Sequence, residues 1–446
     1  MPGPRARVHS AGAPLRPQVE LAGGSPPGRS GDLPPGPRAP LAVQTVQWIT
    51  QPTTLLRRSQ ARYGEPFTLR MAWSDAPMVL TSDPEEIRRV YAAPGDVLEG
   101  GAGAAFMEPF VGRRSLLILD GPEHLKQRRL VLPAFHGEAL RRWTDTIAEL
   151  AHAELDRWSP GRPVQTLERM QALTLEVIMR VVFGTDDPEL RDALRRPLDM
   201  TQSTPRLVAL ALVRRDLGPL SPYGRFLRAV AQVDRLLEQR IAAGGADGSI
   251  LAVLRAAEPD PGQLRDQLVT LLAAGHETTA TALAWAFERL ARHPQQLAAL
   301  RATDGDARLD ATVKEVLRVR PVLSATSRRV RESWRVAGHT LPAGVYVVPC
   351  IYLAHRRADL WPEPTEFRPE RFLEGAPEPF SWVPFGGGVR RCAGAAFAAL
   401  EMREVLRAVA ARFTLQPDRP EGERVIRRSI TLAPARGGKV IPYALA

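Results

Sequence analysis

Apolar residues recur at helical spacing over much of this chain, and shorter apolar runs lie between turn residues. The clearest helix covers about 261–293, where a periodic pattern becomes almost continuously apolar. At helical rise, its roughly 30 residues make it about 45 Å long, so it must run through the core. The segments 66–71 and 76–81 predict a β-pair, followed by a helix at 84–91.

Further helices are predicted over 122–181 and after residue 394, which gives a mainly α fold with small β-sheets (α+β). The glycine-rich stretch 99–103 begins a long loop, and 216–224 forms a second turn-rich break. Long loops in a compact fold are often functional, so both are candidate walls of a binding site. Gly275, in the middle of the long helix, predicts a local distortion there.

The composition indicates one large folded domain. The chain has 446 residues and is 44% hydrophobic. Residues 1–40 are dominated by Pro, Gly, Arg and Ala and are predicted to form a disordered tail, with the domain covering 41–446. Only Cys350 and Cys392 are present, which excludes a disulfide framework and is typical of the cytoplasm. No apolar run reaches the roughly 20 residues that cross a bilayer.

The net charge of +11 comes almost entirely from arginine. Nucleic-acid binding is one interpretation of such a charge. The arginines are scattered through amphipathic helices, however, and no basic run or aromatic platform is present, so no nucleic-acid partner is predicted.

Cys392 lies in the segment F-G-G-G-V-R-R-C-A-G, residues 385–394. Glycines allow a tight turn that directs amide N–H groups at a sulfur, and the following helix presents its positive end to a thiolate. One thiolate held this way indicates haem iron. The alternative for an isolated cysteine is a small buried apolar side chain.

The chain resembles the cytochrome P450 family of haem-thiolate monooxygenases. The family signature F-x-x-G-x-R-x-C-x-G is met by Phe385, Gly388, Arg390, Cys392 and Gly394. The resemblance runs from about residue 41 to the C-terminus and is to soluble bacterial-type members. It includes three upstream motifs in the family's order, A-G-H-E-T-T at 274–279, E-V-L-R at 315–318 and F-R-P-E-R-F at 367–372.

The resemblance implies a haem b cofactor lying between the long helix and the cysteine-bearing helix, with Cys392 as the axial ligand. It implies that Thr278 positions a proton-bearing water at the haem and that Glu277 feeds protons inward. The alternative is that Thr278 bonds back to a helix carbonyl and Glu277 pairs with an arginine. The residues expected to hold the propionates are His124, Arg128, Arg390 and Arg328, with Arg329 as the alternative to Arg328.

Glu315 and Arg318 are three residues apart on one helix, which allows an ion pair. The resemblance adds Arg371 as a third partner. It implies a buried structural network that orders the segment before Cys392.

The expected reaction is hydroxylation or epoxidation of an apolar small molecule, such as a terpenoid, steroid, fatty acid or polyketide of secondary metabolism, with O2. A peroxygenase, an isomerising or ring-forming enzyme and a non-catalytic haem-thiolate sensor remain alternatives. The expected substrate contacts are Phe106, Met107, residues 207–213, Ala273, Ala274, 322–326 with Leu323, and Ile430.

Electrons are expected from a separate acidic ferredoxin-type donor, because the haem domain occupies nearly the whole chain. The protein is expected to be a monomer. The basic residues expected to flank the cysteine-bearing face are Lys126, Arg128, Arg129, Arg141, Arg142, Arg390, Arg391, Arg403 and Arg407.

Overall fold

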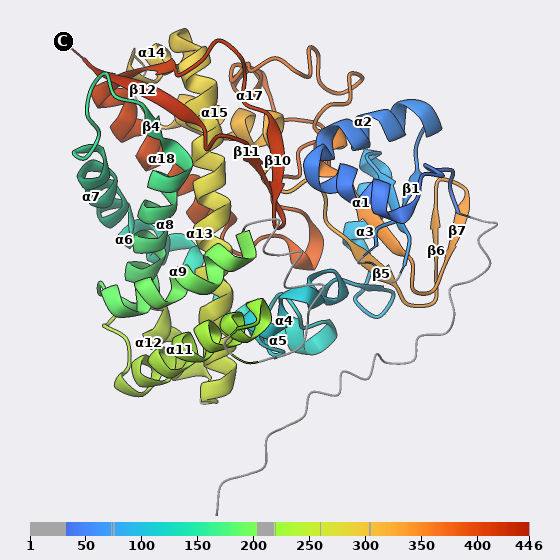
Figure 1. Cartoon of the computed structure of the whole chain (residues 1–446), viewed down its shortest axis with the longest axis horizontal. Helices are drawn as coiled ribbons and strands as arrows, with labels where there is room; N and C mark the ends of the chain where they lie inside the picture. The colour runs from blue at the N-terminus through green and yellow to red at the C-terminus, as the bar shows by residue number, and fades with distance from the viewer. Residues whose placement is uncertain are drawn as a thin grey trace, which may run out of the picture.

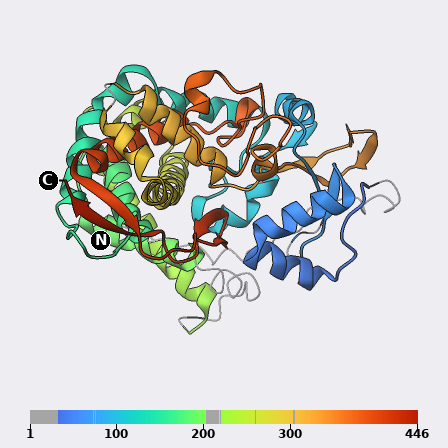
Figure 2. The same ribbon diagram turned by 90° about the horizontal axis from the view of Figure 1, so that it is seen from above.

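The computed structural model describes residues 33–72, 74, 76–202, 218, 220–258, 260–302 and 305–445. Most helices gather in one part of the molecule, and the first helices and most of the largest sheet form the other part (Figure 1). The view from above shows the same division (Figure 2). The helices α13 (Pro261–Arg292) and α18 (Ala395–Arg412) carry the residues that matter most for function.

The remaining helices follow the chain from the N-terminal to the C-terminal side. They are α1 Leu41–Thr50, α2 Pro52–Tyr63, α3 Pro84–Ala92, η1 Gly101–Met107, α4 Glu108–Val111, α5 Gly121–Val131, η2 Leu132–Phe135, α6 Gly137–Arg142, α7 Thr144–Leu155, α8 Thr166–Phe183, α9 Pro188–Gln202, α11 Pro222–Ala243, α12 Ile250–Ala257, α14 Pro294–Ala302, α15 Ala307–Val319, α16 Ile351–Ala354, α17 Arg371–Glu374 and η3 Gly388–Arg390.

The strands form one sheet of five, one of three and two hairpins. The largest sheet has the order β1-β2-β8-β5-β3, the smaller sheet has the order β4-β12-β9, and the hairpins are β6–β7 and β10–β11. Their bounds are β1 Phe67–Leu69, β2 Met78–Thr81, β3 Leu98–Glu99, β4 Val164–Gln165, β5 Arg328–Val330, β6 Ser333–Val336, β7 His339–Pro342, β8 Tyr346–Pro349, β9 Phe413–Pro417, β10 Val425–Arg428, β11 Thr431–Pro434 and β12 Lys439–Ala444.

The helix α13 begins where Asp260 accepts hydrogen bonds from the backbone N–H groups of Gly262 and Gln263. Pro261 suits the first helical turn because its missing N–H is not needed there. Most side chains of α13 are buried, including Trp285 and Phe287. This helix therefore forms the centre of the main core, as its apolar pattern predicts.

The predicted β-pair is confirmed as β1 and β2, which pair antiparallel, and the predicted helix after it is α3. Two other expectations are wrong. The stretch that begins at residue 99 is largely the 3-10 helix η1 and not a loop, because Asp120 accepts from the backbone N–H groups of Gly100 and Gly101 and holds its start. Gly275 does not interrupt α13. A Cβ there would lie 3.3 Å from the side chain of Ile178 on α8, so its small size serves packing.

The chain is already ordered before residue 41, the expected start of the domain. Thr68 of β1 donates from its hydroxyl to the Pro34 carbonyl at 2.6 Å and from its backbone N–H to the Pro35 carbonyl at 2.9 Å. The expected tail, up to residue 32, lies outside the described residues, as does the segment 207–213. In the parts of the chain that are described, no helix is long and apolar enough to cross a membrane.

Candidate functional site

The loop that carries Cys392 is fixed by its own backbone and by α3. The Cys392 N–H donates to the Phe385 carbonyl at 2.9 Å. Gly388 has a φ of 62°, and a Cβ there would lie 1.9 Å from the Tyr91 carbonyl oxygen. Only glycine fits both requirements. Gly394 is the N-cap of α18, so Cys392 lies just before the helix N-terminus.

The two cysteines have opposite surroundings. Cys392 is exposed and Cys350 is buried. Burial raises the pKa of the Cys350 thiol to about 12. The protein around Cys392 also raises the pKa of its thiol, but the backbone N–H of Gly394 and the charge of Arg128 act in the opposite direction. Cys392 is therefore the sulfur that a ligand can reach, and Gly394 and Arg128 are the neighbours that favour its thiolate.

Beside Cys392 lies a cationic group made of Arg128 and Arg328, with His124 next to it. His124 and Arg328 are buried, and Arg128 is half-buried. Burial lowers the pKa of His124 to about 4, and the charges of Arg390, Arg128 and Arg328 contribute to the lowering. In the described part of the chain, none of the three residues forms an ion pair. His124 is neutral at neutral pH because of its low pKa, and the positive charges of Arg128 and Arg328 need an anion from outside the protein.

The β5 strand distinguishes Arg328 from Arg329. Arg328 is buried, with its guanidinium carbon 5.7 Å from the centre of the Tyr91 ring. Arg329 is only half-buried and points toward Gly344. Because neighbouring strand residues face opposite ways, only Arg328 belongs to the cationic group.

Arg390 has a different environment from the one expected. It donates to the carbonyl oxygens of Leu116 and Leu117 at 3.2 Å and 3.3 Å, and it pairs closely with Asp120. Asp120 was not predicted as a partner, and it lies 270 residues away along the chain. Arg390 thus holds the segment before α5 against the cysteine loop.

Glu277 of α13 is buried and has partners on two other elements. The Gln171 side chain on α8 donates to Glu277 at 2.5 Å, and the Arg428 guanidinium at the end of β10 lies 3.7 Å from the carboxylate. Burial raises the pKa of Glu277, while Arg428 and Gln171 oppose that rise. The Arg428 contact is the arginine pair considered as the alternative role of Glu277. Which arginine it is, and the contact with Gln171, were not predicted, because nothing local in the sequence links them to Glu277.

Thr278 and Ala274 form an open strip on an otherwise buried part of α13. Thr278 is half-buried and Ala274 is exposed. The Thr278 hydroxyl donates to the Ala274 carbonyl at 2.7 Å, which is the helix contact considered as its alternative role. A hydroxyl that donates one hydrogen bond can still accept from a water. His276 points the other way, and its ring nitrogen lies 3.2 Å from the Thr174 hydroxyl on α8.

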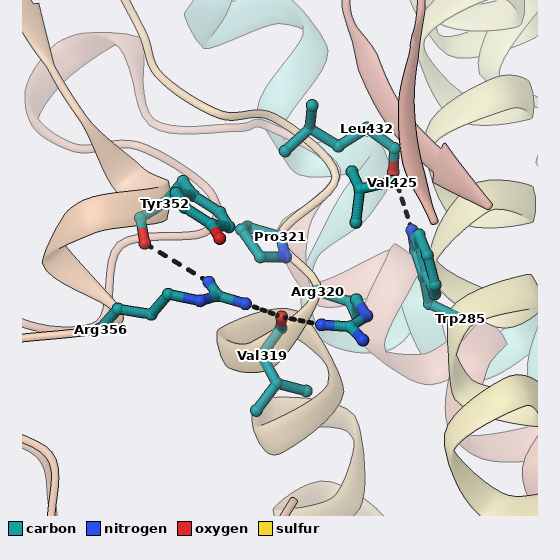
Figure 3. A pocket seen from close by; sticks show the side chains of 8 residues that line it. All are labelled: Trp285, Val319, Arg320, Pro321, Tyr352, Arg356, Val425 and Leu432. Carbon is teal, nitrogen blue, oxygen red and sulfur yellow. Dashed lines mark hydrogen bonds between the residues drawn. The ribbon is translucent and has the colours of Figure 1, made fainter. Parts of the chain in front are cut away.

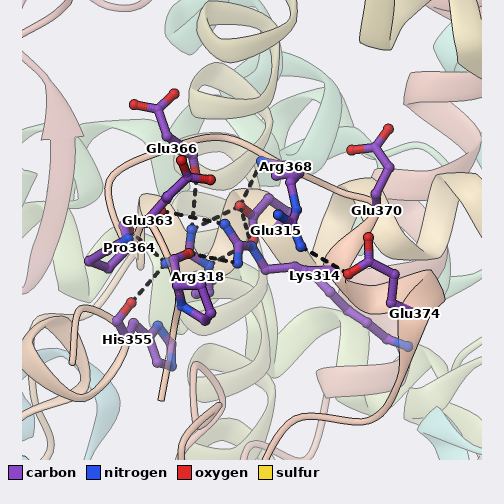
Figure 4. A network of polar contacts seen from close by, with 12 residues as sticks. Lys314, Glu315, Arg318, His355, Glu363, Pro364, Glu366, Arg368, Glu370 and Glu374 are labelled. Carbon is purple, nitrogen blue, oxygen red and sulfur yellow. Dashed lines mark hydrogen bonds and ion pairs between the residues drawn. The ribbon is translucent and has the colours of Figure 1, made fainter. Parts of the chain in front are cut away.

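Glu315, Arg318 and Arg371 come together in the core. Figure 4 shows Glu315 and Arg318 within this network. Glu315 receives two hydrogen bonds from Arg318, at 2.7 Å and 2.8 Å, and one from Arg371 at 3.1 Å. Arg318 also donates to three backbone carbonyls, those of His355, Pro364 and Glu366. Both Glu315 and Arg318 have side chains that are 0% exposed. The network therefore fixes the irregular segment that leads toward the cysteine loop.

The residues expected to contact substrate lie on several elements. Leu323 forms an isolated β-bridge with Thr431, the first residue of β11. Ile430 directly precedes Thr431 and lies in the turn of the β10–β11 hairpin. Phe106, on η1, is 41% exposed, and Met107 packs against the main core. Both Leu323 and Ile430 are partly exposed. Apolar side chains with free surface at these places suit contact with an apolar ligand.

These features fit a haem. An accessible cysteine supplies one thiolate, and the unpaired cationic group beside it suits two carboxylates. Among the described residues, no three His, Cys, Asp or Glu side chains gather as they would for a metal held by the protein alone. The arrangement defines the class of haem-thiolate proteins.

Comparison with known proteins agrees with this class. The family model for cytochrome P450 matches residues 34–440. The chain is 40% identical to putative cytochrome P450 135B1 of Mycobacterium tuberculosis, over 92% of this chain and 91% of that protein. It is 38% identical to putative cytochrome P450 138 of the same species, over 92% of this chain and 96% of that protein.

Solved structures show the same fold. The retinoic acid-bound cyanobacterial CYP120A1 has a TM-score of 0.81 at 22% identity, covering 93% of this chain and 99% of the other. CYP175A1 from Thermus thermophilus has a TM-score of 0.72 at 27% identity, covering 91% and 95%. The chain belongs to the cytochrome P450 family, and as a member it is a monooxygenase that binds haem through a cysteine thiolate.

Proposed function

We propose that Cys392 is the axial ligand and that the enzyme inserts one oxygen atom from O2 into an apolar small molecule by hydroxylation or epoxidation. The observation that carries this proposal is the accessible Cys392 beside Arg128 and Arg328, two cations without ion-pair partners among the described residues, and beside the neutral, buried His124. When bound, the haem supplies reductive activation of O2. His124, Arg128 and Arg328 hold its propionates, and Cys392 holds its iron.

The proposed substrate is a terpenoid, steroid, fatty acid or polyketide. Support comes from the exposed Ala274 on α13 and the partly exposed apolar side chains of Leu323, Ile430 and Met107, which offer surface without charge. A spectral-shift titration of the haem-loaded enzyme with one compound of each class tests this proposal. At least one apolar compound should shift the spectrum saturably. A response only to charged, hydrophilic compounds would contradict the assignment.

Thr278→Ala should leave haem and substrate binding intact while lowering product formed per electron. The hydroxyl is the group on the open strip of α13 that can hold a water and pass a proton. A well-placed proton donor contributes a factor of about 100 or more to the reaction rate. Product and hydrogen peroxide should be measured against reductant consumed. Thr278→Ser, which keeps the hydroxyl, is the matched control. An alanine variant with full product yield would remove this role.

Arg428→Gln should move the pH dependence of coupled turnover to higher pH. The Arg428 charge favours the ionised Glu277 carboxylate, and its removal leaves burial to raise the Glu277 pKa further. Arg428→Lys keeps the charge and should stay close to the parent profile. The groups that also act on Glu277 are Gln171, Asp199 and Thr281. Identical pH profiles for all three enzymes would show that Glu277 does not deliver protons.

Electrons come from an acidic ferredoxin-type protein that docks near Cys392. The structure narrows the set of arginines for this role. Arg142 lies 3.4 Å from Glu138, and Arg407 lies 2.5 Å from Asp306, so both already have internal partners. Arg129, Arg141 and Arg391 are exposed and form no ion pair within the described residues. Free surface charges of this kind can attract an acidic partner.

Charge reversal at Arg391 and Arg141 should raise the concentration of ferredoxin needed for half-maximal reduction. The effect should fade with added salt, because exposed charges are screened within about 8 Å at physiological ionic strength. Arg335→Glu is the control, since Arg335 is exposed on the β6–β7 hairpin, away from α18 (Figure 1). Substrate binding should not change. Salt-insensitive reduction with no effect of either reversal would place the docking surface elsewhere.

A further inference from the structure

Tyr91, near the end of α3, is a buried side chain that none of the roles proposed above uses. Its ring packs directly on the cysteine loop, because a Cβ at Gly387 would lie 2.3 Å from a ring carbon of Tyr91. Gly387 has a φ of -157°, an extended conformation that any residue adopts, so the ring is what requires glycine there. The Tyr91 carbonyl lies against Gly388 in the same loop. Tyr91 therefore supports two consecutive residues of the cysteine loop.

The same ring meets Arg328, the buried arginine proposed to hold a haem propionate. The Arg328 guanidinium carbon lies over the ring, 5.7 Å from its centre, which is within the range of a cation–π contact. Arg328 also donates to the Ser327 carbonyl at 2.9 Å. A ring face and a carbonyl orient a guanidinium without neutralising it, so the positive charge of Arg328 stays available for a carboxylate.

The hydroxyl of Tyr91 fixes the orientation of the ring. It shares a hydrogen bond of 3.1 Å with the Thr326 hydroxyl, and the Thr326 backbone N–H donates to the Pro349 carbonyl at the end of β8. Burial raises the pKa of Tyr91, so its phenol is neutral at neutral pH and Arg328 meets a ring and not a phenolate. The ring is thus held by the cysteine loop along its face or edge and by Thr326 at its hydroxyl.

We propose that Tyr91 is a positioning residue that orients the Arg328 guanidinium toward a haem propionate. The ring joins Arg328 to the cysteine loop, so the side chain that holds a propionate and the loop that holds the iron share one rigid support. A binding group whose own conformation is locked by its neighbours holds its ligand more firmly than a free one. This inference rests on the proposed role of Arg328.

The rate of haem transfer from the ferric holoenzyme to excess apomyoglobin tests the proposal through a double-mutant cycle. Arg328→Gln should speed haem loss because it removes a propionate partner. Tyr91→Leu should speed it roughly tenfold, the size of a desolvated cation–π contact. In the Arg328→Gln background, Tyr91→Leu should add little, because the two residues act through one contact. Additive effects of the two substitutions would overturn the proposal.

Tyr352→Leu is the matched control for the loss of a buried ring beside an arginine. The Arg356 guanidinium carbon lies 3.9 Å from the Tyr352 ring centre, and both side chains line a small cavity (Figure 3). Arg356 is not among the residues proposed to hold haem. The control should lower Tm and leave the rate of haem transfer unchanged. Equal acceleration by Tyr352→Leu and Tyr91→Leu would overturn the proposal, because the effect would then follow from lost stability alone.

A fluorinated ring in place of Tyr91 gives a second measurement that does not depend on the leucine variant folding. Fluorine withdraws electron density from the ring face and changes the shape of the ring little. Trifluorophenylalanine should therefore lose haem faster than Tyr91→Phe, and this difference should vanish in the Arg328→Gln background. Equal rates for the two rings in the presence of Arg328 would overturn the proposal.

The Arg328→Gln variant alone separates this inference from the proposed function. Normal haem retention in Arg328→Gln would overturn the proposed role of Arg328 and this inference with it. Rapid haem loss in Arg328→Gln, with an undiminished effect of Tyr91→Leu in that background, would overturn the role of Tyr91 and leave that of Arg328 intact.

Discussion

Glu315→Ala is expected to destabilise the fold by about 3 to 5 kcal/mol, because it leaves Arg318 and Arg371 as buried charges without a partner. Arg318 is completely buried, and Glu315 is its only carboxylate contact among the described residues. The loss should appear as a lower Tm and as poor haem incorporation, since the network fixes the segment before the cysteine loop. Chemical denaturation followed by haem absorbance measures both effects.

Glu374→Ala is the matched control on the same segment (Figure 4). Glu374 pairs with Arg368 at 2.9 Å, but the two side chains are 61% and 39% exposed. An exposed pair contributes at most about 1 kcal/mol. If Glu315→Ala yielded a stable protein with normal haem content and impaired turnover, the network would have a chemical role and not a structural one.

Cys392→Ser is expected to abolish monooxygenase turnover while leaving the fold largely intact. A hydroxyl is a much poorer electron donor to iron than a thiolate, and the thiolate is what favours O–O cleavage. Stability should change little because Cys392 is exposed and its backbone N–H bond to Phe385 does not involve the side chain. Product formation with an added ferredoxin system and haem content should be measured on the same sample.

Cys350→Ala is the control for the loss of a sulfur. Cys350 is buried, and its thiol contacts the Ser324 carbonyl at 3.7 Å. Its replacement should cost some stability and leave turnover per bound haem unchanged. Turnover that survives Cys392→Ser but not Cys350→Ala would reverse the assignment of the ligand.

Features encoded by neighbouring residues could be predicted from the sequence. The apolar pattern of α13 and the glycines around Cys392 each specify a local conformation, and Glu315 and Arg318 are one helical turn apart. The structure places all of them as their local pattern indicates. Alternation along β5 predicts that Arg328 and Arg329 face opposite ways, but only the structure shows that Arg328 is the buried one.

Features that depend on packing between distant segments could not be predicted. Gln171 lies 106 residues before Glu277, and Asp120 lies 270 residues before Arg390. Polar residues of these types are common on helices and in loops, so nothing in their surroundings marks them as partners. Gly275 suggested a distortion because helix propensity considers one helix alone. The presence of glycine at this position is instead explained by the close approach of Ile178 on α8.

The absorbance spectrum of the reduced protein with carbon monoxide tests the central claim most directly. Wild type should give the red-shifted Soret band that is characteristic of thiolate-ligated haem, and Cys350→Ala should give the same band. Cys392→Ser should bind haem but lose the red shift. An unshifted band in the wild type, or an unchanged red-shifted band in Cys392→Ser, would contradict the assignment of Cys392 as the haem ligand.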